Sequence, residues 1–255
     1  MNNKVAILGC AKNCAKYIST TINNMHRLGS LFSDYHIFIY ENDSLDNTDS
    51  IIRQHGKSAK VTCKTQRFIH YKYKYRTWAL AYARNSLINM LIESKFNPEY
   101  VIVMDMDDIG ANHLNKYIKL INYALSIKPH WDAIFPKVTY DYWAFRYKNC
   151  LVNYIECMKS KYLAAACYNN MQNIIKKIEY NKKGLAPVYS TFNGIGLYKY
   201  NLYIKGTYSG KNILFSINAI QKNSKSSHYD DSEECEHVNF HQSLGPCRLM
   251  MCKKY

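Results

Sequence analysis

The sequence has no long apolar run, and this absence excludes the first large class of protein. No stretch of the 255 residues approaches the roughly 20 apolar residues that a membrane-spanning helix needs. The N-terminal apolar segment, residues 5–11, is too short for the core of a signal peptide and is followed by Lys12 and Asn13. We therefore expect no membrane span and a cytoplasmic location.

The cysteines do not have the spacing of a disulfide-rich protein. Acidic residues are few compared with basic ones. The nine cysteines follow no dense pattern, which favours a reducing compartment and mostly free thiols. The chain has 34 Lys and Arg against 19 Asp and Glu, a formal net charge of +15. No long Lys/Arg block marks a nucleic-acid-binding arm, so we expect no nucleic-acid partner.

An AT-rich coding bias explains part of the excess of lysine. The chain has 24 tyrosines together with abundant Lys, Asn and Ile. Such a composition suggests a bacterium or a large DNA virus as the source. For a viral protein, the expected location is the host cytoplasm or the virion.

The first half of the chain contains apolar runs that alternate with amphipathic segments. Five runs have the length and residue types of buried strands: residues 4–11, 35–40, 59–64, 99–105 and 132–138. Four segments between them have helical periodicity: residues 14–28, 44–55, 76–94 and 113–126. We expect Ser44 to cap the second of these helices. The alternation predicts an α/β fold with a mainly parallel central sheet and helices on both faces.

After about residue 138 the pattern loosens. We expect a mostly helical segment at 151–178, a turn and strand at 188–200, a strand at 212–219, a loop at 223–227 and an acidic, then helical, segment at 232–242. No internal repeat or clear linker interrupts the chain. We therefore predict one domain, residues 1–255, with a first half at 1–138 and a second half at 139–255.

The most informative motif is the acidic end of the fourth predicted strand. Its apolar run stops at Asp105-Met106-Asp107-Asp108. Open α/β sheets bind ligands at the carboxyl edge of their strands. Two carboxylates two residues apart can share a hard divalent cation whose other ligands are water and phosphate. The alternative is an ordinary acidic loop after a strand.

Two other strand ends should lie on the same edge, at residues 10–13 and 41–43. Glu41 and Asp43 have carboxylates that accept hydrogen bonds from a base or a ribose. The alternative for both is a polar turn that leads into the next helix, because such turns have the same composition.

Three motifs in order resemble a known family. They are Asn42-Asp43-Ser44-Leu45-Asp46-Asn47-Thr48, Ala83-Arg84-Asn85 and Met104-Asp105-Met106-Asp107-Asp108. Together they resemble the nucleotide-sugar-binding half of GT-A-fold glycosyltransferases of the family 2 class, and also capsule-type α-mannosyltransferases, over about residues 4–140. The first strand departs from the family 2 pattern, because it ends Cys10-Ala11-Lys12-Asn13 where Pro-x-Tyr-Asn is usual.

The resemblance implies a fold and an activity. The fold would be GT-A-like and Rossmann-type, with residues 1–138 binding the donor and a C-terminal extension, residues 139–255, on the acceptor side. The activity would be that of a metal-dependent hexosyltransferase that uses a UDP- or GDP-sugar. The acceptor would be a hydroxyl of a glycan or glycoprotein.

The resemblance also implies roles at the donor site. Asp105 would face the ribose and the outer shell of a Mn²⁺ or Mg²⁺ ion, which Asp107 would bind directly. Arg84 would make a bidentate hydrogen bond with the diphosphate or with Asp105. The alternative is that Arg84 is an exposed charge on the helix. The residues expected at the nucleotide sugar are Ala11, Asn13, Glu41, Asp43, Arg76, Arg84, Asn85, Asp105 and Met106.

A late acidic cluster supplies the remaining catalytic candidates. Asp231, Glu236 and His237 are candidates for the base that takes the acceptor's proton, and His237 also for completing the metal shell. The alternative is that the cluster forms the acidic first turn of a helix, which the helix dipole favours. Two rival interpretations are a zinc site of Cys235, His237, His241 and Cys247, and a Cys235–Cys247 disulfide.

Aromatic and glycine-containing segments predict the acceptor side. Tyr140 and Trp143 follow a predicted strand and offer flat apolar rings to a sugar. Asn193 and Gly194 allow backbone to approach a bound sugar closely. The alternatives are a packed aromatic patch and an ordinary turn.

Three rival functions remain at this stage. A sugar-phosphate nucleotidyltransferase would need a Gly-rich loop after the first strand, and Gly9-Cys10-Ala11-Lys12 is poor in glycine. An inactive nucleotide- or sugar-binding module is disfavoured by intact Asp105, Asp107 and Arg84. A nucleic-acid-binding protein is supported by charge alone.

Overall fold

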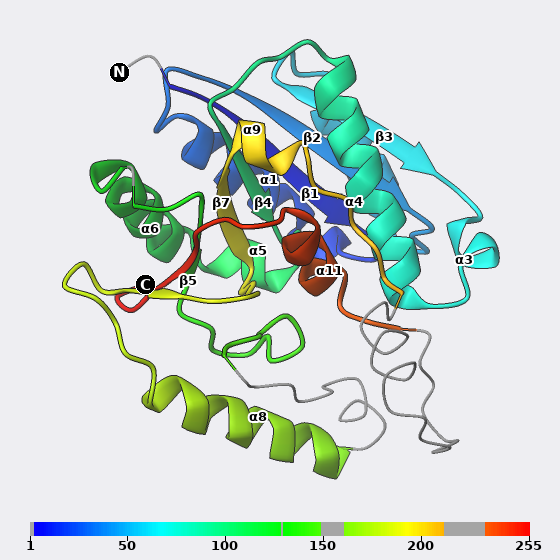
Figure 1. The fold of residues 1–255 in the computed structure, drawn as a ribbon. Helices are drawn as coiled ribbons and strands as arrows, with labels where there is room; N and C mark the ends of the chain where they lie inside the picture. The colour runs from blue at the N-terminus through cyan, green and yellow to red at the C-terminus, as the bar shows by residue number, and fades with distance from the viewer. Residues whose placement is uncertain (1–2, 129, 149–160, 212–232) are drawn as a thin grey trace.

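The computed structural model describes residues 3–128, 130–148, 161–211 and 233–255. Its centre is a β-sheet (Figure 1). The strands within the described residues are β1 (Lys4–Ala11), β2 (Asp34–Asn42), β3 (Val61–Gln66), β4 (Tyr100–Met104), β5 (Ala133–Pro136), β6 (Leu185–Pro187), β7 (Ile195–Lys199) and β8 (Leu249–Cys252). They form one eight-stranded sheet in the order β3-β2-β1-β4-β7-β5-β8-β6.

The sheet is parallel in its first half and mixed in its second. The pairs β1–β2, β2–β3 and β1–β4 are parallel, as is β5–β8. Strand β7 is antiparallel to both of its neighbours, β4 and β5, and β6 is antiparallel to β8. The predicted α/β fold with a mainly parallel central sheet is confirmed.

Helices cover both faces of the sheet. The described helices are α1 (Ala15–Gly29), α2 (Thr48–His55), α3 (Ile69–Lys72), α4 (Arg76–Glu93), α5 (Asp108–Asn112), α6 (Leu114–Ser126), α8 (Lys161–Lys176), α9 (Tyr200–Tyr203) and α11 (Glu236–Ser243). Strand side chains alternate between the two faces, as the pleat requires. Leu8 and Val103 pack in the core with α4 and α11, whereas Ile7 and Ile102 pack in the core with α1 and α6.

The predicted boundaries agree best in the first half. Strand β1 spans the predicted residues 4–11, and α4 ends one residue before the predicted boundary. Strands β6 and β8 and the short helices α3, α5 and α9 were not predicted. The predicted strand at 212–219, the loop at 223–227 and the first part of the helix at 151–178 lie outside the described residues.

The predicted helix cap at Ser44 is wrong. Helix α2 begins at Thr48, and its N-cap residue is Asn47. The Ser44 hydroxyl instead accepts a hydrogen bond from the backbone N–H of Asn13, at 3.0 Å. Ser44 therefore links the ends of β1 and β2, a long-range contact that competes with the local capping bond.

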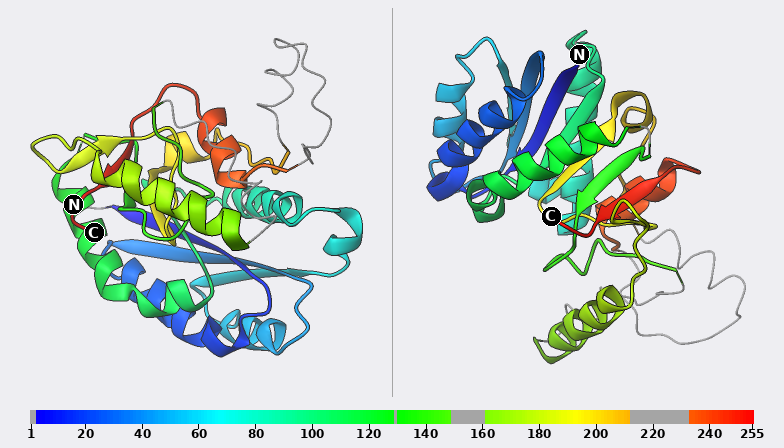
Figure 2. Two further views of the ribbon diagram at one scale, coloured as in Figure 1. Left: turned by 90° about the horizontal axis from the view of Figure 1, so that it is seen from below. Right: turned by 90° about the vertical axis from the view of Figure 1, so that its left-hand side faces the viewer.

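The position of α8 and the lengths of the helices complete the description of the fold. Helix α8 lies apart from the central sheet in Figure 1 and in the right-hand view of Figure 2. Its Gln172 side chain donates to the Thr139 carbonyl oxygen. Among the described helices, none is long and apolar enough to cross a membrane.

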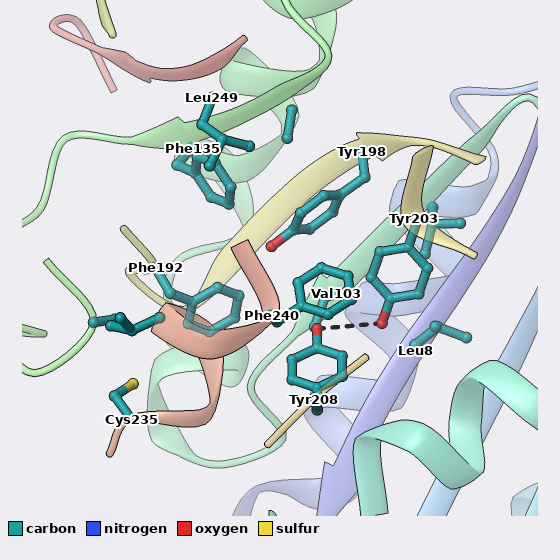
Figure 3. Packing of buried hydrophobic residues seen from close by; sticks show 14 of the residues in the cluster. Leu8, Val103, Phe135, Phe192, Tyr198, Tyr203, Tyr208, Cys235, Phe240 and Leu249 are labelled. Atoms are coloured by element: carbon teal, nitrogen blue, oxygen red, sulfur yellow. Dashed lines mark hydrogen bonds between the residues drawn. The ribbon is translucent and has the colours of Figure 1, made fainter. Parts of the chain in front are cut away.

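A buried aromatic cluster fixes α11 to the sheet (Figure 3). Phe240 of α11 stacks on Tyr208, with ring centroids 4.0 Å apart and an interplanar angle of 11°. Tyr198 of β7 and Tyr203 of α9 contact the same phenylalanine ring. The Tyr203 and Tyr208 hydroxyls are 3.3 Å apart. This packing sets the position at which α11 begins.

Replacing Phe240 tests how far this cluster stabilises the fold. Phe240→Ala should lower the free energy of unfolding by about 3–5 kcal/mol, because it removes a buried ring and leaves a cavity. Urea denaturation followed by circular dichroism measures the change. Tyr162→Ala is the matched control, since the Tyr162 side chain is 85% exposed and its loss should leave the stability nearly unchanged.

Candidate functional site

A cavity of about 680 Å³ opens at the carboxyl ends of β1, β2 and β4. Its walls come from these strand ends, from segment 70–84, from the loop at 140–143 and from the start of α11. Three separate parts of the chain thus converge on the edge of the sheet where parallel strands bind ligands.

The acidic motif lies where β4 leaves the sheet. The Asp105 backbone N–H donates to the Gly194 carbonyl oxygen at 3.0 Å, and Asp107 Oδ1 accepts from the Ile109 N–H at 3.1 Å as the N-cap of α5. Gly110 lies so close that a Cβ there would stand 2.0 Å from the Asp105 carbonyl oxygen. The backbone around the two carboxylates is therefore held from several sides.

Asp105 lies deep in the protein, with part of its surface open to the cavity. Burial raises the pKa of its carboxyl group to about 6, and the charge of Asp107 acts in the same direction. Arg84 and a 3.1 Å hydrogen bond from the Tyr140 hydroxyl oppose this shift. A cation bound at Asp105 would relieve the same electrostatic cost.

Arg84 forms a buried ion pair with Glu236. Its Nε donates to Glu236 Oε1 at 3.0 Å, and the two side chains are 7% and 6% exposed. The guanidinium carbon also lies 5.6 Å from the centre of the Phe192 ring and 5.7 Å from that of Tyr208. The alternative interpretation of Arg84 as an exposed helix charge is therefore wrong.

Asp141 is a second carboxylate on the cavity wall, half-buried and just beyond β5. Burial raises its pKa to about 7, and the negative charge of Asp105 adds to the shift. Its Oδ1 accepts a hydrogen bond from the Ala144 backbone N–H at 3.2 Å. Among the described residues, no cation forms an ion pair with Asp141.

His237 lines the cavity as a neutral imidazole. Its ring stacks on Phe192 at a centroid distance of 3.9 Å, and neither ring nitrogen has a hydrogen-bond partner among the described residues. Burial lowers its pKa well below the usual value, and Arg84 and His241 lower it further. Both nitrogens are also buried, so the ring forms part of the wall with two polar atoms unpaired within the described part of the chain.

The zinc and disulfide interpretations find no support. His241 uses both ring nitrogens, toward the Ser190 hydroxyl at 2.8 Å and the Tyr198 hydroxyl at 2.9 Å. Cys235 and Cys247 are both free. Within the described ranges, no group of three or more His, Cys, Asp or Glu side chains is arranged to hold a metal ion. His237 is thus not placed with Asp105 and Asp107 as a preformed ligand set.

Most of the predicted site residues line the cavity. They are Ala11, Asn13, Arg76, Arg84, Asp105, Met106, Asp107, Tyr140, Trp143, Glu236 and His237. Five others lie behind its wall: Glu41, Asp43, Asn85, Asn193 and Gly194. Asp231 is outside the described residues.

The residues behind the wall hold the backbone of the site. Glu41 Oε1 accepts from the Ser44 N–H, and Asp43 Oδ2 accepts from the His70 N–H, both at 2.9 Å. The Asn85 amide exchanges two hydrogen bonds with the Tyr208 backbone. Asn193 Oδ1 accepts from the Thr139 N–H at 2.9 Å. These side chains therefore form hydrogen bonds with the protein backbone and do not line the cavity.

The donor atoms fit a hard divalent cation. Asp105 and Asp107 offer carboxylate oxygens, and Asp107 Oδ2 accepts no hydrogen bond from any residue that the structure describes. Mg²⁺ is commonly held by one or two carboxylates together with substrate phosphates and water, so two protein ligands suffice.

Several cavity residues were not predicted as site residues. They include Cys10, Asn42, His70, Tyr73, Lys74, Tyr75, Phe192 and Asp141. Asp141 follows the fifth predicted strand, so the rule about strand ends that identified Asp105 would have identified it too. The run at 70–75 has a composition that also suits a solvated face, and nothing in its spacing marks it as a cavity wall.

Comparison with known proteins gives one family match. The family model for glycosyl transferase family 2 matches residues 7–197. No curated protein matches the sequence.

Similar solved structures are distant in sequence. TarS 1–349 from S. aureus in complex with UDP-GlcNAc is 13% identical with a TM-score of 0.46, covering 99% of this chain and 56% of that chain. The mannosyltransferase PcManGT from Pyrobaculum calidifontis in complex with GDP-Man and Mn²⁺ is 11% identical with a TM-score of 0.49, covering 99% and 57%. The chain spans little more than half the length of these relatives. At such similarity, substrate and mechanism have to be argued from the site itself.

The raised pKa of the half-buried Asp141 carboxyl group predicts a pH-dependent stability. Its pKa is about 7 in the folded protein and 3.8 in a free side chain, so the folded state binds the proton more tightly. Its stabilising contribution is complete below the unfolded pKa and is lost as the pH rises through about 7. Relative to Asp141→Asn, the wild type should therefore lose about 1–3 kcal/mol of unfolding free energy between about pH 4 and pH 8.

Urea denaturation of both proteins across this pH range measures the difference. Asp108→Asn, at an exposed acid outside the cavity, is the control and should follow the wild type. Parallel stability curves for the wild type and Asp141→Asn would contradict the assignment.

Proposed function

Since the chain belongs to glycosyl transferase family 2, we propose that it transfers a sugar from a nucleoside-diphosphate sugar to an acceptor hydroxyl with the help of Mn²⁺ or Mg²⁺. The donor is a UDP- or GDP-sugar, and the acceptor is a glycan or glycoprotein. The observation that carries the proposal is the pair Asp105 and Asp107 at the end of β4, inside a cavity of about 680 Å³.

The metal would be held by these two carboxylates. When bound, it would neutralise the negative charge that develops on the departing nucleoside diphosphate. Asp107 is the direct ligand because it is exposed and has a free carboxylate oxygen, whereas Asp105 is fixed by the Tyr140 hydroxyl. This hydrogen bond also holds the Tyr140 ring in the cavity wall beside Asp105, where it can face the sugar of the donor.

Arg84 and two rim cations bind the diphosphate side of the donor. The Nε of Arg84 donates to Glu236, and neither of its Nη groups makes a hydrogen bond to a residue that the structure describes. A guanidinium held in this way presents two parallel donors to phosphate oxygens. Lys12 and Arg76 line the same cavity and add positive charge at its mouth.

Asp141 and Glu236 have different surroundings and so different roles. The charge of Glu236 is compensated by Arg84, and this carboxylate positions the guanidinium. Asp141 has no such partner among the described residues, and its pKa of about 7 suits a general base near neutral pH. In an inverting transfer, Asp141 would take the proton of the acceptor hydroxyl, while Trp143 and His237 contact the sugars.

Metal-dependent donor binding is the first test. In thermal melting with a panel of nucleoside diphosphates and nucleotide sugars, one nucleotide should raise the melting temperature when Mn²⁺ is present and not when a chelator is added. Asp107→Ala should abolish this shift and lower kcat/KM by about 10²–10³-fold.

Asp108→Ala is the matched control for that experiment. Asp108 is the neighbouring exposed acid and does not line the cavity, so the shift should persist in this variant. No shift with any nucleotide, or an equal loss in both variants, would overturn the assignment of the donor site. A metal-dependent shift without sugar transfer would leave a nucleotide-binding module in place of the enzyme.

The division of roles between the two carboxylates predicts different kinetics. Asp141→Asn should lower kcat by about 10²–10⁴-fold with a smaller effect on donor binding. The wild-type rate should rise with pH as Asp141 loses its proton, with a midpoint below about 7 because the bound cation offsets the charge of Asp105, and Asp141→Asn should lose this rise. Glu236→Gln should chiefly weaken donor binding, because it frees Arg84. A pH profile that is unchanged in Asp141→Asn would exclude Asp141 as the base.

A further inference from the structure

Three large apolar side chains are exposed beside the mouth of the cavity. Leu45 is 95% exposed, Phe68 is 70% exposed and Tyr71 is 78% exposed. They lie on the loop after β2 and on the segment after β3 that includes α3, which stands out from the body of the molecule in Figures 1 and 2. We call these three residues the apolar rim patch.

The two loops that carry the patch are joined to each other. Arg67 donates from a terminal nitrogen to the Ser44 carbonyl oxygen at 2.7 Å, and the His70 N–H donates to Asp43 at 2.9 Å. The Phe68 and Tyr71 rings lie with centroids 6.0 Å apart. Leu45 therefore projects from a loop that is tied directly to the segment bearing the two rings.

The backbone at Phe68 is strained. Its φ of +66° lies in the left-handed region, which a bulky side chain rarely adopts. The Asp43 carboxylate helps to hold this turn through the His70 N–H. A costly conformation that keeps an aromatic ring in water points to a role for the ring outside the core.

Positive charge is concentrated in the segment that carries Phe68 and Tyr71. The sequence has no acidic residue between Asp49 and Glu93. In the same stretch, five exposed cations lie on β3 and the segment that follows it: Lys64, Arg67, Lys72, Lys74 and Arg76. The three acids on the loop after β2 and at the start of α2 are all engaged within the protein. Asp43 accepts from the His70 N–H, Asp46 accepts from the Thr48 hydroxyl, and Asp49 pairs with Arg53 and Arg67.

We propose that the apolar rim patch docks the protein on an anionic lipid membrane. Apolar and aromatic side chains that enter the headgroup region, flanked by Lys and Arg, are the features by which proteins lie on such a surface. Single-stranded nucleic acid also binds aromatic and basic groups, but through stacking on flat rings, in which the aliphatic side chain of Leu45 has no part.

Docking in this way would bring the cavity close to the bilayer. His70, Tyr73, Lys74 and Tyr75 belong to the same segment as the patch and line the cavity. An acceptor hydroxyl at the membrane surface would then be within reach of the site. The membrane contact itself does not depend on the proposed sugar transfer, so the two proposals can fail separately.

Vesicle sedimentation tests the proposal without any assay of activity. The wild-type protein should sediment with vesicles of phosphatidylcholine and phosphatidylserine, more weakly as salt is raised, and remain in solution with phosphatidylcholine alone. The triple variant Leu45→Ser, Phe68→Ser, Tyr71→Ser should lower the partition coefficient by about tenfold or more. Lys64→Glu with Lys72→Glu should lower it by a similar factor, since both residues lie outside the cavity wall.

The double variant Tyr162→Ser, Tyr189→Ser is the matched control. It removes two rings that are 85% and 67% exposed elsewhere on the chain and should bind vesicles as the wild type does. Equal binding by the patch variant and the control would overturn the proposal, as would binding that is independent of phosphatidylserine. If the triple variant does not fold, the charge variant decides. Patch-dependent binding to a single-stranded RNA, without binding to vesicles, would also overturn it.

Discussion

The buried ion pair between Arg84 and Glu236 is the interaction on which the site depends. It joins α4 to the start of α11 with both side chains almost wholly out of water. Removing one partner of such a pair typically costs about 3–5 kcal/mol, because the other charge is left buried and uncompensated. The same guanidinium moderates the pKa values of Asp105 and Asp141, so one cation balances much of the negative charge of the cavity. The aromatic cluster around Phe240 keeps α11 where this pair can form.

The first half of the fold could be predicted because its signals are local. Buried strands such as β1 and β4 are short apolar runs, and the parallel arrangement follows from their alternation with helices. The acidic end of β4 was visible in the sequence for the same reason, and parallel strands bring their carboxyl ends to one edge. The cavity at that edge therefore contains most of the residues that the sequence indicated.

The remaining features depend on contacts between distant residues. No local sequence pattern indicates that Arg84 pairs with Glu236. The strands β6 and β8 are too short to be recognised from sequence and form because they pair with neighbouring strands of the sheet. Ser44 has the composition of a helix cap, but its hydroxyl binds the end of β1. Glu41, Asp43 and Asn85 have residue types suited to a ligand, and burial turns them toward protein backbone. Residue type alone does not separate these two uses.

The antiparallel strand β7 has a consequence for how the two halves of the chain can vary. It comes from the second half, yet it is hydrogen-bonded between β4 and β5, and the residue before it accepts the Asp105 N–H. A recombination event that exchanged the second half would also replace a central strand and a backbone partner of the acidic motif. Variation in the lining of the cavity is therefore expected to arise by substitution at 140–143 and at the start of α11, with the strands between them inherited as one block.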